Sequence, residues 1–253
     1  MSARPVPTNL SKVPLVDALF EMRVDAPVSL AVVLPGVLLS GTVPGEVAVE
    51  RLPIADIPEP VRQATPELRY QPTMRIRLKD ASVALGDRVV VIGARGAYPG
   101  WTAFQRQISI LLDRIQATSY VKAVERYSLK YVDLIEEISG QNYDDRVKLS
   151  ILIGGERKVN GAYQLRGEIK EAPATHVLTV AAPATVQNPE IGFDKTGMVI
   201  DVDSIVTCDP PIQMVEFREN LSEWLTSLHD GNKRLFFSML TDLAIDSMGP
   251  SYE

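Results

Sequence analysis

Residues 101–115, WTAFQRQISILLDRI, carry a strongly periodic helical pattern, and the predicted architecture is arranged around them. Counting from Phe104, apolar residues recur four, seven, eight and eleven positions later, at Ile108, Leu111, Leu112 and Ile115. These offsets fall on one stripe of a helix with 3.6 residues per turn. We therefore predict a helix whose apolar stripe lies on a larger apolar surface.

The same pattern returns near the C-terminus as MVEFRENLSEWLTSL, residues 214–228. Its apolar positions reproduce those of the first stretch at one fixed offset, and they are Phe217, Leu221, Leu225 and Leu228. A serine also recurs after the second apolar position, as Ser109 and Ser222. This repetition predicts that the fold is built from two similar halves.

The elements predicted for the first half begin with a strand over 14–24, because its apolar and polar residues alternate. An apolar stretch over 28–39 predicts a short helix, although it contains Pro35. Six prolines between 43 and 72 predict an irregular segment, with a short helix near 60–64. Three compact strands then precede the first long helix, at 74–78, 82–85 and 88–93.

The second half begins again with a predicted strand, over 124–135, where Tyr127, Leu129 and Tyr131 alternate with their neighbours. Acidic residues in its first turn favour a helix over 143–152. Three further strands are predicted, at 162–170, 175–182 and 198–206. The chain should then end in one long or two consecutive helices over 211–228 and 232–248, with an interruption at Asp230-Gly231.

Both halves therefore follow the order strand, short helix, three strands, long helix. Such units predict an α+β fold: a curved antiparallel sheet, internally duplicated, with its long helices on one face. We expect a flexible leader over 1–13, a first repeat half over 14–122 and a second over 123–253. The two halves should pack as one module.

Two resemblances accompany this pattern. The element order is similar to the duplicated, saddle-like fold of the TATA-binding protein, although no sequence motif of that protein is present. The chain also resembles a sporadically distributed bacterial family of similar length, through PLVDALFEMRV (14–24), ERYSLKYVDLI (125–135) and LHDGNKRLFFSMLTD (228–242). The second resemblance implies a bacterial accessory protein but transfers no site residue, because no activity is established for that family.

Composition narrows the classes of function. The 253 residues are 45% hydrophobic and 23% charged, as in ordinary globular proteins. A net charge of −6 argues against a nucleic-acid partner, because affinity for nucleic acid rests on Lys and Arg at phosphates. A single cysteine, Cys208, excludes an intramolecular disulfide and a CxxC site. With no secretory signal and no apolar stretch long enough to span a bilayer, we expect a cytoplasmic protein without membrane contact.

Few residues suggest chemistry. Gly93-Ala94-Arg95-Gly96 follows a strand and precedes a helix, which suggests either a phosphate loop or a connecting turn. Asp201 and Asp203 share one face of a predicted strand, as two carboxylates that hold Mg²⁺ or Ca²⁺ would. The same alternation also fits a strand with polar residues outward and apolar residues in the core.

The remaining titratable candidates are two histidines and the cysteine. His176 lies in a predicted strand, and His229 ends a predicted helix, where a cation would complement the helix dipole. Neither histidine has the spacing of a zinc site. Cys208 as a nucleophile would need a histidine brought close by folding, so we interpret it as a small residue at a strand end.

The final helix is apolar on more than one face, so it is either buried in its own protein or part of an interface. The candidate interface residues are Trp224, Phe236, Phe237 and Met239. We therefore predict a non-enzymatic protein–protein interaction module without a cofactor, such as an accessory or antitoxin-like component of a bacterial stress or defence locus. The alternatives are a binder of small apolar ligands with a helix-grip fold and a metal-dependent enzyme using Asp201 and Asp203. Homo-oligomerisation stays open.

Overall fold

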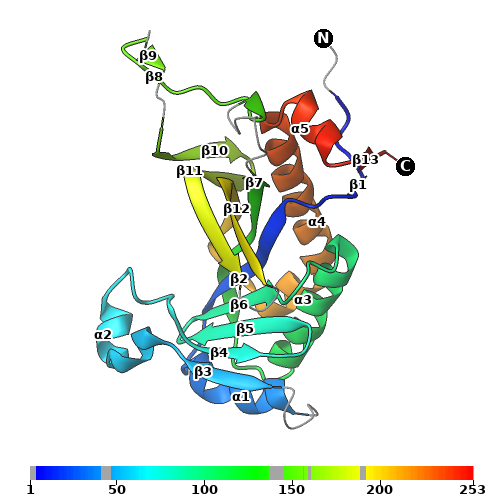
Figure 1. Cartoon of the computed structure of the whole chain (residues 1–253). Helices are drawn as coiled ribbons and strands as arrows, with labels where there is room; N and C mark the ends of the chain where they lie inside the picture. Colours follow the sequence, from blue (N-terminus) through cyan, green and yellow to red (C-terminus); the bar gives the residue numbers. More distant parts are fainter. Residues whose placement is uncertain are drawn as a thin grey trace. The chain divides into compact units, whose positions relative to one another are not determined.

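The computed structural model describes residues 4–40, 47–136, 145–155, 157–158, 161–188 and 192–252. Its described strands lie mainly in a large antiparallel sheet accompanied by helices, which confirms the predicted α+β class (Figure 1). The chain divides into two compact units. Unit 1 consists of Met1–Asp17, Lys130–Ser204 and His229–Glu253, and unit 2 of Ala18–Leu129 and Ile205–Leu228. Each unit combines segments from both predicted halves, so these boundaries differ from 14–122 and 123–253.

In unit 2, four strands that are consecutive in sequence form an antiparallel meander, and further strands extend it. Its strands follow the order β7-β2-β6-β5-β4-β3. Their bounds are β2 Leu15–Asp25, β3 Ala48–Arg51, β4 Pro72–Arg77, β5 Ala81–Gly86, β6 Val89–Ala94 and β7 Ala123–Glu136. Strands β2 and β7 begin or end in unit 1. The register places Phe20 of β2 opposite Ile92 of β6, which in turn lies opposite Val83 of β5. Side chains directly opposite on one face pack together, so this row forms part of the core.

Helices cover the core of unit 2. Helix α1, Leu30–Leu39, buries Leu30, Leu34 and Leu38, one residue per turn, and packs against α3, Trp101–Gln116. The residues that α3 buries are those of the predicted stripe, Phe104, Ile108, Leu111, Leu112 and Ile115. The strand at 14–24, the short helix at 28–39 and the long helix at 101–115 are therefore confirmed.

The echo helix lies beside α3. The first part of α4, Met214–Met239, belongs to unit 2 and runs antiparallel to α3. Arg218 donates to Ser109 Oγ at 2.6 Å and forms an ion pair with Asp113 at 2.6 Å. In return, Gln105 Nε2 donates to the Ser222 carbonyl oxygen at 3.0 Å. The polar residues around the two apolar stripes thus join the helices.

The proline-rich segment is fixed to the sheet by a buried ion pair. It contains a 3-10 turn, η1 (Pro53–Asp56), which was not predicted. It also contains the short helix α2 (Glu59–Ala64), which confirms the helix predicted near 60–64. From α2, Arg62 donates to both carboxylate oxygens of Asp87, each at 2.9 Å, and Asp87 lies in the β5–β6 turn. Ser29 Oγ adds a hydrogen bond to the same carboxylate at 2.7 Å.

Unit 1 contains the order β10-β11-β12-β7. The bounds are β10 Tyr163–Glu171, β11 Ala174–Asn188 and β12 Phe193–Gln213, of which β12 continues into unit 2. Two small two-stranded sheets pair β1 (Asn9–Leu10) with β13 (Pro250–Ser251) and β8 (Leu152–Ile153) with β9 (Arg157–Lys158). The second part of α4 and helix α5, Asp242–Ser247, complete the unit.

The core of unit 1 lies between these strands and helices. Alternate residues of β12 point into it, namely Met198, Ile200 and Val202. They meet Val180 and Ala182 of β11 and the residues from the end of α4 onward, namely Phe236, Phe237, Leu240, Ala244, Ile245 and Met248. The three strands predicted at 162–170, 175–182 and 198–206 are confirmed.

The helix predicted over 143–152 is wrong for the residues that the structure describes from Asp145 onward; Tyr143 and Asp144 lie outside them. Val147 instead forms a β-bridge with Leu240, and the Lys148 amide donates to the Met239 carbonyl at 2.6 Å. The end of α4 leaves carbonyl groups without helical partners, and the Lys148 amide is the donor to one of them. Local helix propensity is therefore overridden by pairing within unit 1.

The boundaries of the last helices also differ from prediction. Strand β12 continues to Gln213, so α4 begins at Met214 and not at Pro211. The helix continues through Gly231 and ends at Met239, so the predicted break at Asp230-Gly231 is wrong. A Cβ at Gly231 would lie only 3.1 Å from the His176 ring, so the glycine serves close packing, not a turn.

The described part of the predicted leader is paired within unit 1. Strand β1 pairs with β13, and the Thr8 amide donates to the Ser251 carbonyl at 2.8 Å. None of the helices in the described ranges has the length and apolarity to cross a bilayer.

Candidate functional site

A fully buried polar cluster joins three elements of unit 1. It consists of His176 on β11, Ser204 on β12 and Asn232 on α4. Asn232 Nδ2 donates to the Val202 carbonyl at 2.7 Å and to Ser204 Oγ at 3.0 Å. Ser204 Oγ lies 2.8 Å from His176 Nδ1. Each member thus has a partner, as buried polar groups require.

The cluster continues to the surface through charged residues. His176 Nε2 lies 3.6 Å from Glu171, which forms an ion pair with Arg234 at 2.9 Å. We assign the hydroxyl proton of Ser204 to the bond with Nδ1, which leaves the ring proton on Nε2, facing Glu171. Burial, assisted by Arg234 and opposed by Glu171, lowers the pKa of His176, so the imidazole is neutral at physiological pH.

A serine, a histidine and a carboxylate that contact one another in this order have the composition of a hydrolytic triad. Here, however, Ser204 has no exposed surface, and its oxygen is already occupied by Asn232 and His176. The arrangement therefore fixes α4 against β11 and β12. No motif in the sequence indicates this cluster, because Ser204 is 28 positions away from each of its two partners.

His229 lies inside α4 and not at a helix end, so the predicted dipole role is wrong. Its Nδ1 lies 3.0 Å from the Tyr131 hydroxyl, with the two rings edge to face. Burial, and then the charge of Lys233, lower the pKa of His229 to about 4, with Asp230 opposing. The ring is consequently a neutral partner of Tyr131.

This pKa predicts an acid-dependent loss of stability. The unfolded chain, with a pKa of 6.5, binds a proton more readily than the fold, so the contribution is present above pH 6.5 and lost as pH falls through about 4. The pKa difference between the unfolded chain, 6.5, and the folded chain, about 4, corresponds to roughly 3 kcal/mol of stability. An NMR titration should give the low pKa, and His229→Gln should flatten the stability profile between those pH values. A ring that titrates near 6.5 would contradict the prediction.

Asp201 and Asp203 share the face of β12 opposite the core. Lys130 forms an ion pair with Asp201 at 2.7 Å, while the residues that alternate with the two aspartates, Ile200, Val202 and Ser204, are fully buried. In the described parts of the chain, no three His, Cys, Asp or Glu side chains form a group that could hold a metal ion. The alternation therefore has the polar-outward form that the sequence allowed.

A buried acid lies near this pair. Asp133 on β7 is almost fully enclosed, and burial followed by the charge of Asp201 raises its pKa to about 8. The carboxyl group is therefore mainly protonated at neutral pH. An acid with such a pKa is suited to proton transfer. One enclosed carboxyl does not by itself define an active site.

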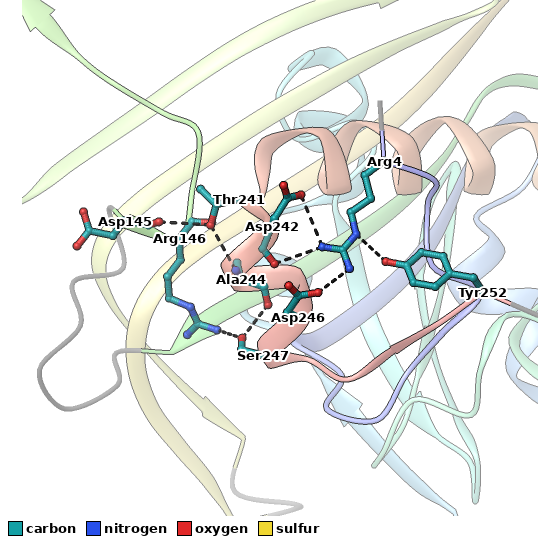
Figure 2. Close-up of polar contacts among 9 residues, drawn as sticks. All are labelled: Arg4, Asp145, Arg146, Thr241, Asp242, Ala244, Asp246, Ser247 and Tyr252. Carbon is teal, nitrogen blue, oxygen red and sulfur yellow. Dashed lines mark hydrogen bonds and ion pairs between the residues drawn. The ribbon is translucent and has the colours of Figure 1, made fainter. Parts of the chain in front are cut away.

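Polar contacts around α5 tie the two chain ends together. Figure 2 shows the Arg4 guanidinium between Tyr252 and Asp246, which it meets at 2.8 and 2.6 Å. On the other side of the helix, Arg146 donates to Ser247 Oγ at 2.5 Å (Figure 2). Thr241 caps α5 by accepting from the Ala244 amide. These contacts hold α5 in place and leave no converging groups for chemistry.

The remaining candidates are placed in unit 2. Gly93 lies in β6, where an added Cβ would come within 2.9 Å of Leu19, and Arg95 donates to the Leu78 carbonyl at 2.8 Å. These contacts support the connecting-turn interpretation. Cys208 is buried, which raises its pKa to about 11, so it is a thiol and not a thiolate nucleophile.

The predicted interface residues are only partly available. Phe236 and Phe237 lie in the core of unit 1, edge to face with each other, so they are not anchors for a partner. Met239 is half-buried and packs against the same core. Trp224, in unit 2, stacks on Tyr127 and is also half-buried. Self-burial of the helix, which the sequence left open, explains its two apolar faces.

An exposed apolar surface lies instead along β10, the end strand of the unit 1 order. Its residues Leu165 and Ile169 are 36% and 42% exposed. They lie opposite Val180 and His176 of β11, on the face that carries the core. Every residue of β10 after Tyr163 is exposed. The core face of the sheet therefore extends past the edge of its own helical cover.

No protein-family model matches the chain, and the search of curated proteins found no similar sequence.

Proposed function

We propose that this chain is a non-enzymatic interaction module that binds another polypeptide along edge strand β10. One observation carries the proposal: a nine-residue edge strand whose core-side residues Leu165 and Ile169 are uncovered. Native proteins usually shorten, twist or cover such an edge, because its free amide and carbonyl groups pair readily with another strand. Addition of a strand would satisfy these groups and cover both apolar side chains.

The β8–β9 hairpin, which precedes β10 in the sequence, supports the same kind of use. Its strand β8 consists of Leu152 and Ile153, which are 55% and 64% exposed. Uncovered aliphatic residues of this kind are typical of protein-binding surfaces. The polar clusters described above, by contrast, are satisfied by contacts within the chain.

Capture from the native host tests the proposal. We expect the wild-type chain to retain a specific protein and the Leu165→Lys/Ile169→Lys variant to lose it, because charges on the core side oppose strand addition. The matched control is Val28→Lys/Val32→Lys, which adds the same charges at exposed valines of unit 2. Equal capture by wild type and the β10 variant would contradict the proposal.

Internal duplication is part of the proposal. Positions 104, 105 and 109 correspond to 217, 218 and 222 at an offset of 113. Gln105 contacts Ser222, and its counterpart Arg218 contacts Ser109. Such reciprocity is what a two-fold relation between equivalent helices produces. A saddle-like fold similar to that of the TATA-binding protein would follow, but the net charge of −6 favours a protein partner.

A role as an accessory or antitoxin-like component of a bacterial stress or defence locus, in the cytoplasm, rests on the family resemblance alone. The small apolar ligand and the metal-dependent chemistry at Asp201 and Asp203 remain alternative hypotheses.

A further inference from the structure

We infer that the polypeptide bound by β10 is the β10 strand of a second copy of this chain, paired antiparallel about a two-fold axis at Gly167. This inference rests on the proposed function, because it names the occupant of the same edge. It is carried by the sequence of β10, YQLRGEIKE, which is complementary to itself when read in the opposite direction.

The polar face of the strand shows the complementarity in its charges. With Gly167 opposite its own copy, Arg166 of one strand lies opposite Glu168 of the other, and the symmetry repeats the pair. Lys170 lies opposite the neutral Gln164. Opposite charges directly across an antiparallel pair stabilise it, and like charges destabilise it. Within one strand Arg166 and Glu168 form a 3.7 Å ion pair in which the side chains are 62% and 53% exposed, and the dimer would exchange this pair for the two pairs across the axis.

The core-side face is complementary in its apolar groups. In the same register, Leu165 of each copy lies opposite Ile169 of the other. Each pair extends the row formed with Val180 and His176 of β11, so the apolar face would continue from one copy into the next. Side chains directly opposite lie on the same face of a sheet, so core sides match only in registers that place odd residues opposite odd residues.

Neighbouring registers are disfavoured. A shift of two residues in one direction places Glu168 opposite its own copy and Arg166 opposite Lys170. The opposite shift places Arg166 opposite its own copy. Of these three registers, only the one centred on Gly167 avoids like charges, and it pairs the whole strand. A fully paired nine-residue ladder would add on the order of nine hydrogen bonds.

The axis itself is open for close approach. No atom lies within 4 Å of the position that a Cβ on Gly167 would occupy. Residues directly opposite in an antiparallel pair have Cα atoms about 4.5–5.5 Å apart, which is within the range of a disulfide. The native Cys208 is buried, so it does not compete for the reaction.

Two independent experiments test the inference on the full chain. Light scattering and sedimentation of the wild type should give a dimer. Arg166→Glu should raise the dissociation constant of the dimer about tenfold. Arg166→Glu/Glu168→Arg should restore the wild-type value, because the swapped charges are complementary again. Thermal melting and circular dichroism of each variant control for folding. A monomeric wild type at about 100 µM, or a charge swap no better than the single variant, would overturn the inference.

Crosslinking tests the axis directly. Gly167→Cys should form a covalent dimer in mild oxidant, whereas Lys170→Cys should not, because residues 170 of the two copies would lie about 20 Å apart at 3.4 Å per residue. If Lys170→Cys formed the covalent dimer more readily than Gly167→Cys, the proposed register would be overturned. If the wild type is monomeric but its Leu165→Lys/Ile169→Lys variant loses the captured protein, self-pairing is overturned and edge binding stands. If the wild type is monomeric and this variant retains the captured protein, the edge-binding proposal is overturned as well.

Discussion

Replacing Asp87 by alanine is expected to lower the free energy of unfolding by about 3–5 kcal/mol, because the change leaves the Arg62 guanidinium buried without its counter-charge. The Asp87 side chain is 3% exposed and that of Arg62 10%, so water replaces the lost partner poorly. The change also removes the acceptor of the Ser29 hydroxyl at the start of α1. One carboxylate thus joins α1, α2 and the β5–β6 turn.

Urea or thermal unfolding measures this loss. The matched control is Asp56→Ala, since Asp56 forms a 2.8 Å pair with Arg51 in which both side chains are largely exposed. Exposed pairs contribute little, so its effect should stay below about 1 kcal/mol. The double variant Arg62→Ala/Asp87→Ala should lose less than the sum of the single losses. Additive losses would show that the two side chains are not energetically coupled.

Replacing Phe217 by alanine is expected to cost about 3–5 kcal/mol, the usual range for a large-to-small change in a close-packed core. Phe217 is completely buried in unit 2. Its ring meets Tyr127 edge to face at 5.1 Å and Trp224 at 5.8 Å between centroids. Removing it would open a cavity below the start of α4 and withdraw an aromatic partner from both residues.

Comparing the unfolding free energies of variants at positions 215 and 217 of α4 separates the effect of burial from that of helix propensity. Val215→Ala, at a position of the same helix that is mostly exposed, should change stability by less than about 0.5 kcal/mol. Tryptophan emission reports the same event, because loosening around Trp224 should shift it to longer wavelength. A loss below about 1 kcal/mol for Phe217→Ala would show that the site collapses around the missing ring.

Regular local patterns were sufficient for most elements. The buried set of α3 follows from its 3.6-residue period, and Ala18, Phe20, Met22 and Val24 follow from alternation. These predictions succeeded because the period of the apolar residues alone decides which face is buried. The same reasoning placed no partner beside His176 or Cys208.

Two of the failures share a cause. Residues from 145 onward have helical composition but pair with the end of α4, and Gly231 continues a helix because the His176 ring occupies the space beside it. His229 was expected to be a cation at a helix end, whereas the length of α4 makes it a neutral interior residue. In the first two cases a group distant in sequence overrode the local preference.

The candidate binding edge depends partly on the local sequence and partly on the tertiary structure. Its alternation and its self-complementary charges are written in YQLRGEIKE and can be read without coordinates. That β10 is an edge strand, and that Leu165 and Ile169 extend past the helical cover, depends on strand order and on where α4 ends. Periodicity is local and is therefore encoded in neighbouring residues. Burial, ion-pair geometry and exposure depend on what packs opposite, and only the folded chain decides that.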